Sequence, residues 1–237
     1  MVVVPAGDDL ESLPIANYLG DTERQRLSSY TYPKRRTEWL GGRIAAKYAI
    51  LMIDNPENTE LQDTWLSLEI KSEKDGRPVI HDTMHPERLM ADISISHSHG
   101  MAAGLAFGRG RCGVDIQQIT STVEKVKERF VDTAEEAVVA ALPMAGSGSR
   151  PLTLLWAAKE ALRKAVGTKV LPGFLGIIKV CAARQGIPGG PLGEHMILDC
   201  SLIPHPDAVK KSTTTFPVAA IFLGEYVLAF TGLKEKM

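Results

Sequence analysis

The residues best suited to chemistry in this 237-residue chain lie in two segments. Residues 113–117 alternate apolar and polar side chains, which predicts a strand whose polar face carries Asp115 and Gln117. Residues 155–165 have helical spacing and place Trp156, Glu160 and Lys164 along one stripe. Taken alone, Glu160 and Lys164 would be an ordinary surface pair. Carboxylates from a strand and a helix, with a lysine beside them, suit a hard cation that holds a phosphate.

Other polar groups could bind an anion. In a predicted helix over residues 33–53, Arg36, Arg43 and Lys47 lie on one side, either covering the rim of the core or gripping an anion. Further along, a strand that ends in Ser96 and His97 offers donors to phosphate oxygens. An alternative is that His97 and the histidine two residues later bind a transition metal.

Composition limits the class of protein. A formal net charge of -1 argues against a general nucleic-acid binder, whose affinity depends on many basic contacts. The three cysteines, Cys112, Cys181 and Cys200, are widely spaced and fit reduced thiols in a cytoplasmic protein. The start lacks the basic segment of a signal peptide, and no apolar run approaches a membrane span of about 20 residues.

The elements that must position these residues alternate between helices and groups of strands. Helices are expected over residues 21–30, 33–53, 122–130 and 155–165, and one from residue 132 or 133. Strands are expected at 65–70, 77–80, 91–96, 101–107, 112–119, 175–182, 195–199, 218–223 and 226–231. The turn 75–76 precedes a strand, and loops are expected at 143–151, 185–193 and 204–217. Grouped strands with hairpin-length turns predict an α+β fold.

Five motifs occur in one order along residues 35–167. They are Arg36 with the segment 39–47, Gly76-Arg77-Pro78, the segment 95–98, the segment 113–115, and Trp156 with Lys159, Glu160 and Lys164. Together they resemble the 4′-phosphopantetheinyl transferases, in the two-domain class that activates peptide and polyketide synthetases. The resemblance implies two similar subdomains related by a pseudo-twofold axis, each a small antiparallel sheet packed with a long helix. We expect these at residues 1–109 and 110–237, with coenzyme A in the cleft between them.

The resemblance also implies the reaction and its residues. A serine hydroxyl of an acyl or peptidyl carrier protein would attack the β-phosphate of coenzyme A, and 3′,5′-ADP would leave. It implies Mg²⁺ held by Asp115, Gln117 and Glu160, with Glu160 also accepting the serine proton and Lys164 steadying the phosphoryl group. Coenzyme A would contact the residues Arg36, Arg43, Gly76, Arg77, Pro78, Ser96, His97, Lys159 and Lys164.

One departure from the family pattern concerns the metal. The family usually has Glu two residues after the strand Asp, whereas this chain has Gln117, whose amide oxygen can ligate Mg²⁺ but brings no charge. We expect activity to survive with a higher Mg²⁺ requirement. The alternative is a catalytically impaired protein that still binds coenzyme A or a carrier.

The family also implies where the carrier protein binds. The segment 120–130 follows the metal strand and would receive an acidic carrier, although its pattern equally fits an amphipathic helix packed on the core. We expect a cytoplasmic monomer that binds neither nucleic acid nor membrane. The sequence identifies neither the carrier nor the role of residues 183–217.

Overall fold

The computed structural model describes residues 1–7, 10, 12–54, 62–88, 90–167, 175–187, 192–203 and 214–234. The chain divides into two compact units, one of Met1–Ile116 with the end of the chain from Gly232, the other of Gln117–Thr231. The division therefore falls inside a strand, seven residues after the expected boundary at 109/110. The helix predicted over residues 33–53 was expected to stop at Asn55-Pro56, and these two residues lie outside the described residues. Most of the predicted loop 204–217 lies outside them as well.

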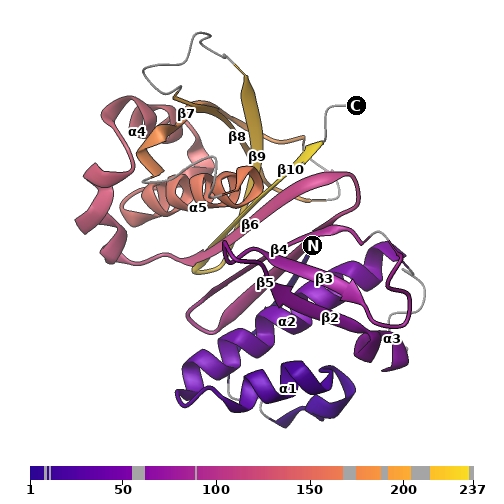
Figure 1. Ribbon diagram of the computed structural model, residues 1–237. Helices are drawn as coiled ribbons and strands as arrows, with labels where there is room; N and C mark the ends of the chain where they lie inside the picture. Colours follow the sequence, from indigo (N-terminus) through magenta and orange to yellow (C-terminus); the bar gives the residue numbers. More distant parts are fainter. Residues whose placement is uncertain are drawn as a thin grey trace. The chain divides into compact units, whose positions relative to one another are not determined.

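The first unit combines one long helix with a small antiparallel sheet (Figure 1). Its helices are α1 (Asp21–Ser28), α2 (Pro33–Asp54) and α3 (Gln62–Ser67), with the 3-10 helix η2 (Ile15–Asn17). Its strands are β1 (Val2–Pro5), β2 (Leu68–Ser72), β3 (Pro78–Asp82), β4 (Asp92–Ser98) and β5 (Met101–Phe107), followed by β6 (Gly110–Gln118), which continues into the second unit. The strand order is β1-β5-β4, and β2 pairs with β3 in a separate antiparallel ribbon.

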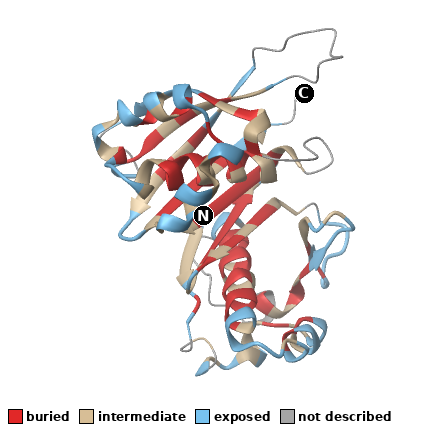
Figure 2. Cartoon of the chain, turned by 90° about the vertical axis from the view of Figure 1, so that its left-hand side faces the viewer, coloured by how far each residue is buried: buried red, intermediate tan, exposed pale blue. Residues whose placement is uncertain are grey.

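Helix α2 packs closely on this sheet because small residues face each other across the contact. Buried residues follow most of its length (Figure 2), and it lies against β5, β4 and β1. A Cβ added at Gly104 of β5 would come within 2.4 Å of the backbone of Ala45 and Ala46. Because backbone atoms cannot move aside as a side-chain tip can, this position requires glycine for the helix to lie on the sheet.

The second unit also packs a long helix on an antiparallel sheet. Its sheet has the order β6-β10-β9-β8-β7, formed with β7 (Ile178–Gln185), β8 (Met196–Leu202), β9 (Thr215–Leu223) and β10 (Tyr226–Lys234). The helices are α4 (Thr133–Ala140), α5 (Ser149–Val166) and the 3-10 helices η3 (Ser121–Arg129), η4 (Pro143–Ala145) and η5 (Leu175–Ile177). Helix α5 contacts β7, β8 and β9. The predicted α+β class with antiparallel sheets is confirmed.

Several predicted elements differ in detail. The segment 65–70 was predicted as one strand, but α3 runs to Ser67 and β2 begins at Leu68. Strand β1 was not predicted, and helix α5 starts two residues before the predicted loop ends. Residues 121–129 form a 3-10 helix. Within the described residues, no helix is both long enough and apolar enough to span a membrane.

Candidate functional site

A pocket of about 580 Å³ lies within the first unit. Side chains and backbone from α1, α2, β2, β4 and the start of β3 line it: Thr22, Glu23, Arg26, Tyr30, Arg35, Glu38, Trp39, Gly42, Arg43, Glu69, Ile70, Lys71, Ser72, Gly76, Pro78, Ile95 and His97. Four residues expected to contact coenzyme A, namely Arg43, Gly76, Pro78 and His97, therefore share one cavity. Its volume is in the range of small-molecule sites.

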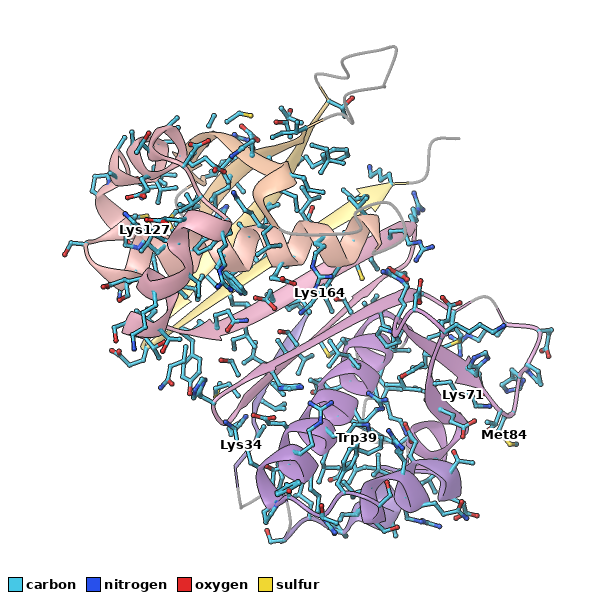
Figure 3. The ribbon with its side chains drawn as sticks, turned by 60° about the vertical axis from the view of Figure 1, so that its left-hand side comes forward. Lys34, Trp39, Lys71, Met84, Lys127 and Lys164 are labelled. Atoms are coloured by element: carbon cyan, nitrogen blue, oxygen red, sulfur yellow. The ribbon has the colours of Figure 1, made fainter. Side chains whose placement is uncertain are left out.

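Three arginines and two aromatic rings form part of the pocket wall. The guanidinium of Arg26 lies 5.2 Å from the centre of the Tyr30 ring, and that of Arg35 lies 5.9 Å from it. The guanidinium of Arg43 lies 4.6 Å from the Trp39 ring, which is 5.9 Å from Tyr30. Figure 3 labels Trp39 on α2. Stacking on an aromatic face leaves the N–H groups at the guanidinium edge able to donate to an anion.

The acidic residues of the pocket wall are matched by lysines. Glu69 pairs with Lys71 at 2.9 Å, and Glu38 lies 3.9 Å from the ammonium of Lys34. The carboxylate of Glu23 accepts a hydrogen bond from the buried ammonium of Lys47. Since these lysines offset the three carboxylates, the charge of the pocket arginines is in excess. The pocket is therefore suited to an anion with more than one negative charge.

Lys47 supports the pocket wall from behind and does not line it. Its side chain is fully buried, and its ammonium also donates to the carbonyls of Tyr18 at 2.9 Å and Trp65 at 3.2 Å. Burial lowers the pKa of Lys47, although the pair with Glu23 opposes this shift. Arg43 lies 4.0 Å from the same carboxylate, and burial lowers its pKa as well. Lys47, one of the three basic residues that could bind an anion, therefore has a structural role.

The ring of His97 is held between two charged side chains. Its Nε2 lies 3.2 Å from a guanidinium nitrogen of Arg35, and its Nδ1 lies 3.4 Å from the carboxylate of Glu38. Because arginine only donates, Nε2 accepts, and the neutral ring carries its hydrogen on Nδ1. His99 lies beyond the end of β4 in a two-residue turn, with φ of 43°. Within the described residues, no group of three His, Cys, Asp or Glu side chains that could hold a metal ion comes together.

The segment 76–78 is divided between the pocket and the sheet. Gly76 has φ of 85° and closes a turn in which its N–H donates to the carbonyl of Glu73. This places Gly76 and Pro78 on the pocket. The Arg77 side chain instead pairs with Asp92 and donates to the Cys112 carbonyl at 3.3 Å. The expectation that Arg77 contacts coenzyme A is therefore not supported, and neither Arg36 nor Ser96 lines the pocket.

Strand β6 carries Asp115 in a buried position. Its side chain is 2% exposed, and Ser96 Oγ donates to its Oδ1 at 2.8 Å. Gln117 is half-buried and lies two residues further along the same strand, so both side chains point to one side of β6. Both residues offer oxygen donors of the kind that Mg²⁺ prefers.

Helix α5 presents Glu160 and Lys164 as half-buried side chains (Lys164 is labelled in Figure 3). The carboxylate of Glu160 accepts from Arg163 at 2.7 and 3.0 Å. Glu160 therefore has a charged partner three residues further along the same helix. Trp156 packs edge-on against Phe130, with ring centres 5.0 Å apart.

Lys159 is enclosed in a buried ion pair. It is fully buried, donates to the carbonyl of Phe130 and lies 2.6 Å from the carboxylate of Glu135. Burial lowers its pKa, although Glu135 opposes this shift. Glu135 also completes a capping box with Asp132 at the start of α4. A phosphate contact by Lys159 would require breaking this buried pair, and its expected contact with coenzyme A stays a prediction.

Residues 111–194 match the family described as the 4′-phosphopantetheinyl transferase superfamily. No curated protein matches the chain. The matched part contains Asp115, Gln117 and the whole of α5. It supports phosphopantetheine transfer as the general type of activity. The match supports the resemblance drawn from the sequence motifs, since residues 111–194 are similar to the 4′-phosphopantetheinyl transferase superfamily.

Proposed function

We propose that the protein transfers the 4′-phosphopantetheine arm of coenzyme A to a serine of an acyl or peptidyl carrier protein. The observation that carries this proposal is the pocket of the first unit, in which predicted ligand residues meet an excess of arginine charge. The superfamily match supplies the type of reaction.

The nucleotide end of coenzyme A fits the chemistry of this pocket. Arg26, Arg35 and Arg43 can donate to phosphate oxygens through guanidinium edges, and such bonds to an anion are roughly twice as strong as neutral ones. The apolar parts of Trp39, together with Pro78, offer surface to the adenine. In this arrangement the pocket residues bind and orient the substrate and take no part in bond breaking.

The residues expected at a metal site have the donor set that Mg²⁺ requires. Asp115 and Glu160 supply carboxylates and Gln117 an amide oxygen, with no sulfur or imidazole among them. In the proposed site these three residues would hold the ion. When bound, Mg²⁺ would neutralise the diphosphate and stabilise the charge that develops on the departing oxygen. Because Gln117 stands where the family usually has a glutamate, the site has one negative ligand fewer and would bind Mg²⁺ more weakly.

The chain's own residues then handle the proton and the phosphoryl group. The carrier serine oxygen forms a bond to the β-phosphorus, the bond from that phosphorus to 3′,5′-ADP breaks, and the serine proton passes to Glu160 or to a water that it orients. Lys164 donates to the transferring phosphoryl group. Arg163 fixes the rotamer of Glu160 through its two hydrogen bonds.

The carrier protein would bind at η3. Lys125 and Arg129 are exposed on this segment, and Val126 is half-buried between them. Lys127, labelled in Figure 3, pairs with Glu136 at 3.2 Å. An acidic carrier helix would meet the exposed cations, and the valine would supply apolar contact.

A gel assay tests the proposal. The protein is mixed with fluorescent coenzyme A, an apo carrier protein and Mg²⁺, and the carrier is examined for label. We expect label with the native chain and with Glu194→Ala, which removes an exposed carboxylate. We expect none with Glu160→Ala. Equal labelling by Glu160→Ala and the native chain would contradict the role of Glu160.

Gln117 favours a second candidate, a protein that binds coenzyme A or a carrier without transfer. If this second candidate were correct, calorimetry would detect coenzyme A binding, but the gel assay would show no label on any of several carrier proteins. Retention of Asp115, Glu160 and Lys164 argues for the transferase, since a site without function has no reason to keep them.

A further inference from the structure

Strands β4 and β6 are joined by side chains in place of a backbone ladder at three positions. The N–H of Cys112 donates to Asp92 Oδ2 at 2.7 Å, that of Val114 to Ser94 Oγ at 3.0 Å, and that of Ile116 to Ser96 Oγ at 3.2 Å. The partners advance together by two residues, so the two strands run parallel. Alternate β4 side chains thus serve as acceptors for alternate β6 amides.

Each of these bonds satisfies a buried donor. Cys112, Val114 and Ile116 are fully buried, and Ser94 and Ser96 are 3% and 6% exposed. A buried N–H that loses its acceptor costs about 1–3 kcal/mol, because water cannot replace the partner. The three side chains therefore fix the position of β6 against β4.

Ser96 makes one contact that Ser94 is not seen to make. Besides accepting from Ile116, its hydroxyl donates to Oδ1 of Asp115, which is itself 2% exposed. A hydroxyl has a single hydrogen, so this bond commits its only donor to the carboxylate. Through this hydroxyl, the Asp115 carboxylate is linked to the backbone N–H of Ile116.

We infer that Ser96 is a positioning residue that fixes the Asp115 carboxylate for metal binding, a role that rests on the proposed function. It replaces the direct contact with coenzyme A that the sequence led us to expect. A carboxylate held in one rotamer by a neighbouring hydroxyl binds a cation without losing further side-chain entropy. Hydrogen-bond partners of metal ligands typically contribute about 10–100-fold in metal affinity.

Ser94 provides a matched control for this role. Ser94→Ala and Ser96→Ala each remove a buried acceptor of a β6 amide, but only Ser96→Ala removes the bond to Asp115. Mn²⁺ binding to the full chain, measured by electron paramagnetic resonance, reports metal affinity without turnover. The melting temperature reports the structural cost of each variant.

We expect Ser96→Ala to weaken Mn²⁺ binding by about tenfold and Ser94→Ala by less than twofold. Both variants should lower the melting temperature, and Ser96→Ala somewhat more, because it also removes the donor to the buried Asp115 carboxylate. Ser96→Thr keeps the hydroxyl and should bind Mn²⁺ like the native chain. Should Ser96→Ala fail to fold, Ser96→Cys gives the same comparison, since a thiol is a weak donor.

Two outcomes overturn different parts of the reasoning. Suppose that the native chain binds Mn²⁺ and labels a carrier. Equal Mn²⁺ affinities of Ser94→Ala and Ser96→Ala would then refute the positioning role alone. A native chain that neither binds Mn²⁺ nor labels a carrier would refute the proposed function, and the role of Ser96 with it.

Discussion

Replacing Lys159 with methionine separates a structural role from a substrate contact. The side chain is 0% exposed, and its ammonium bonds the Phe130 carbonyl and the Glu135 carboxylate. The resemblance to the family implied a phosphate contact, which would make Lys159→Met raise the KM for coenzyme A. The structure instead predicts a loss of stability with little change in that KM.

The size of the loss follows from what the variant leaves behind. Removing one partner of a buried ion pair costs about 3–5 kcal/mol when the other charge is left alone. Here Glu135 keeps Lys179 at 3.4 Å and the N–H of Val180 at 2.9 Å. Methionine also fills most of the lysine volume. We therefore expect the free energy of unfolding to fall by about 2–4 kcal/mol.

The assay combines unfolding with transfer. For a chain of this size, a loss of that order lowers the melting temperature by roughly 4–16 °C. Urea unfolding gives the free energy, and transfer to a carrier at a temperature where both proteins are folded gives the KM. Lys164→Met is the control, since its half-buried side chain should affect transfer more than stability. Native stability together with a raised KM in Lys159→Met would refute the structural role.

Four further predictions concern the metal, the carrier and the thiols. Gln117→Glu should lower the Mg²⁺ concentration for half-maximal transfer, because a carboxylate adds negative charge to the ligands; an unchanged value in an Mg²⁺ titration would contradict this. Val126→Asp should raise the KM for the carrier several-fold by placing an acid before an acidic partner, while coenzyme A affinity, measured by calorimetry, stays constant; loss of both would indicate a folding defect. Burial raises the pKa of the Cys200 thiol from 9.0 to about 12. Between pH 9 and 12 the folded chain keeps a thiol proton that the unfolded chain releases. The contribution of Cys200 to the free energy of unfolding is therefore fully present below pH 9 and is lost as the pH rises from 9 to 12. In urea unfolding, the free energy of unfolding of Cys200→Ala should fall less steeply over that pH range than that of the native chain. An identical pH dependence in the two proteins would exclude Cys200 as its cause. In the native protein a thiol reagent should modify Cys181, which is exposed, before Cys112 and Cys200, which are buried.

The correct element predictions rest on local patterns. The apolar segment predicted as a strand at residues 101–107 matches β5, and the strands predicted at 218–223 and 226–231 match β9 and β10, which a turn at Gly224 with φ of 58° joins. Asp132 caps α4 through the capping box. Each of these features depends on a few neighbouring residues, which a sequence shows directly.

The missed elements depend on contacts between distant segments. Strand β1 is four residues long and exists through its pairing with β5, where Val3 lies opposite Ala103. The segment at Trp65 continues a helix because this ring packs with Tyr18 and Tyr48, 5.2 and 6.0 Å away. Neither partner is visible in the local pattern.

The sequence by itself determined which oxygen donors the chain offers to the proposed metal ion, since it fixes the types and spacing of Asp115, Gln117 and Glu160. Only the tertiary structure decided which polar side chains are available for it. Arg43 and Lys159 are equally charged in the sequence, but one lines a pocket and the other is enclosed with a carboxylate. The cost of burying an unpaired charge enforces this division, and it depends on neighbours that come from remote parts of the chain.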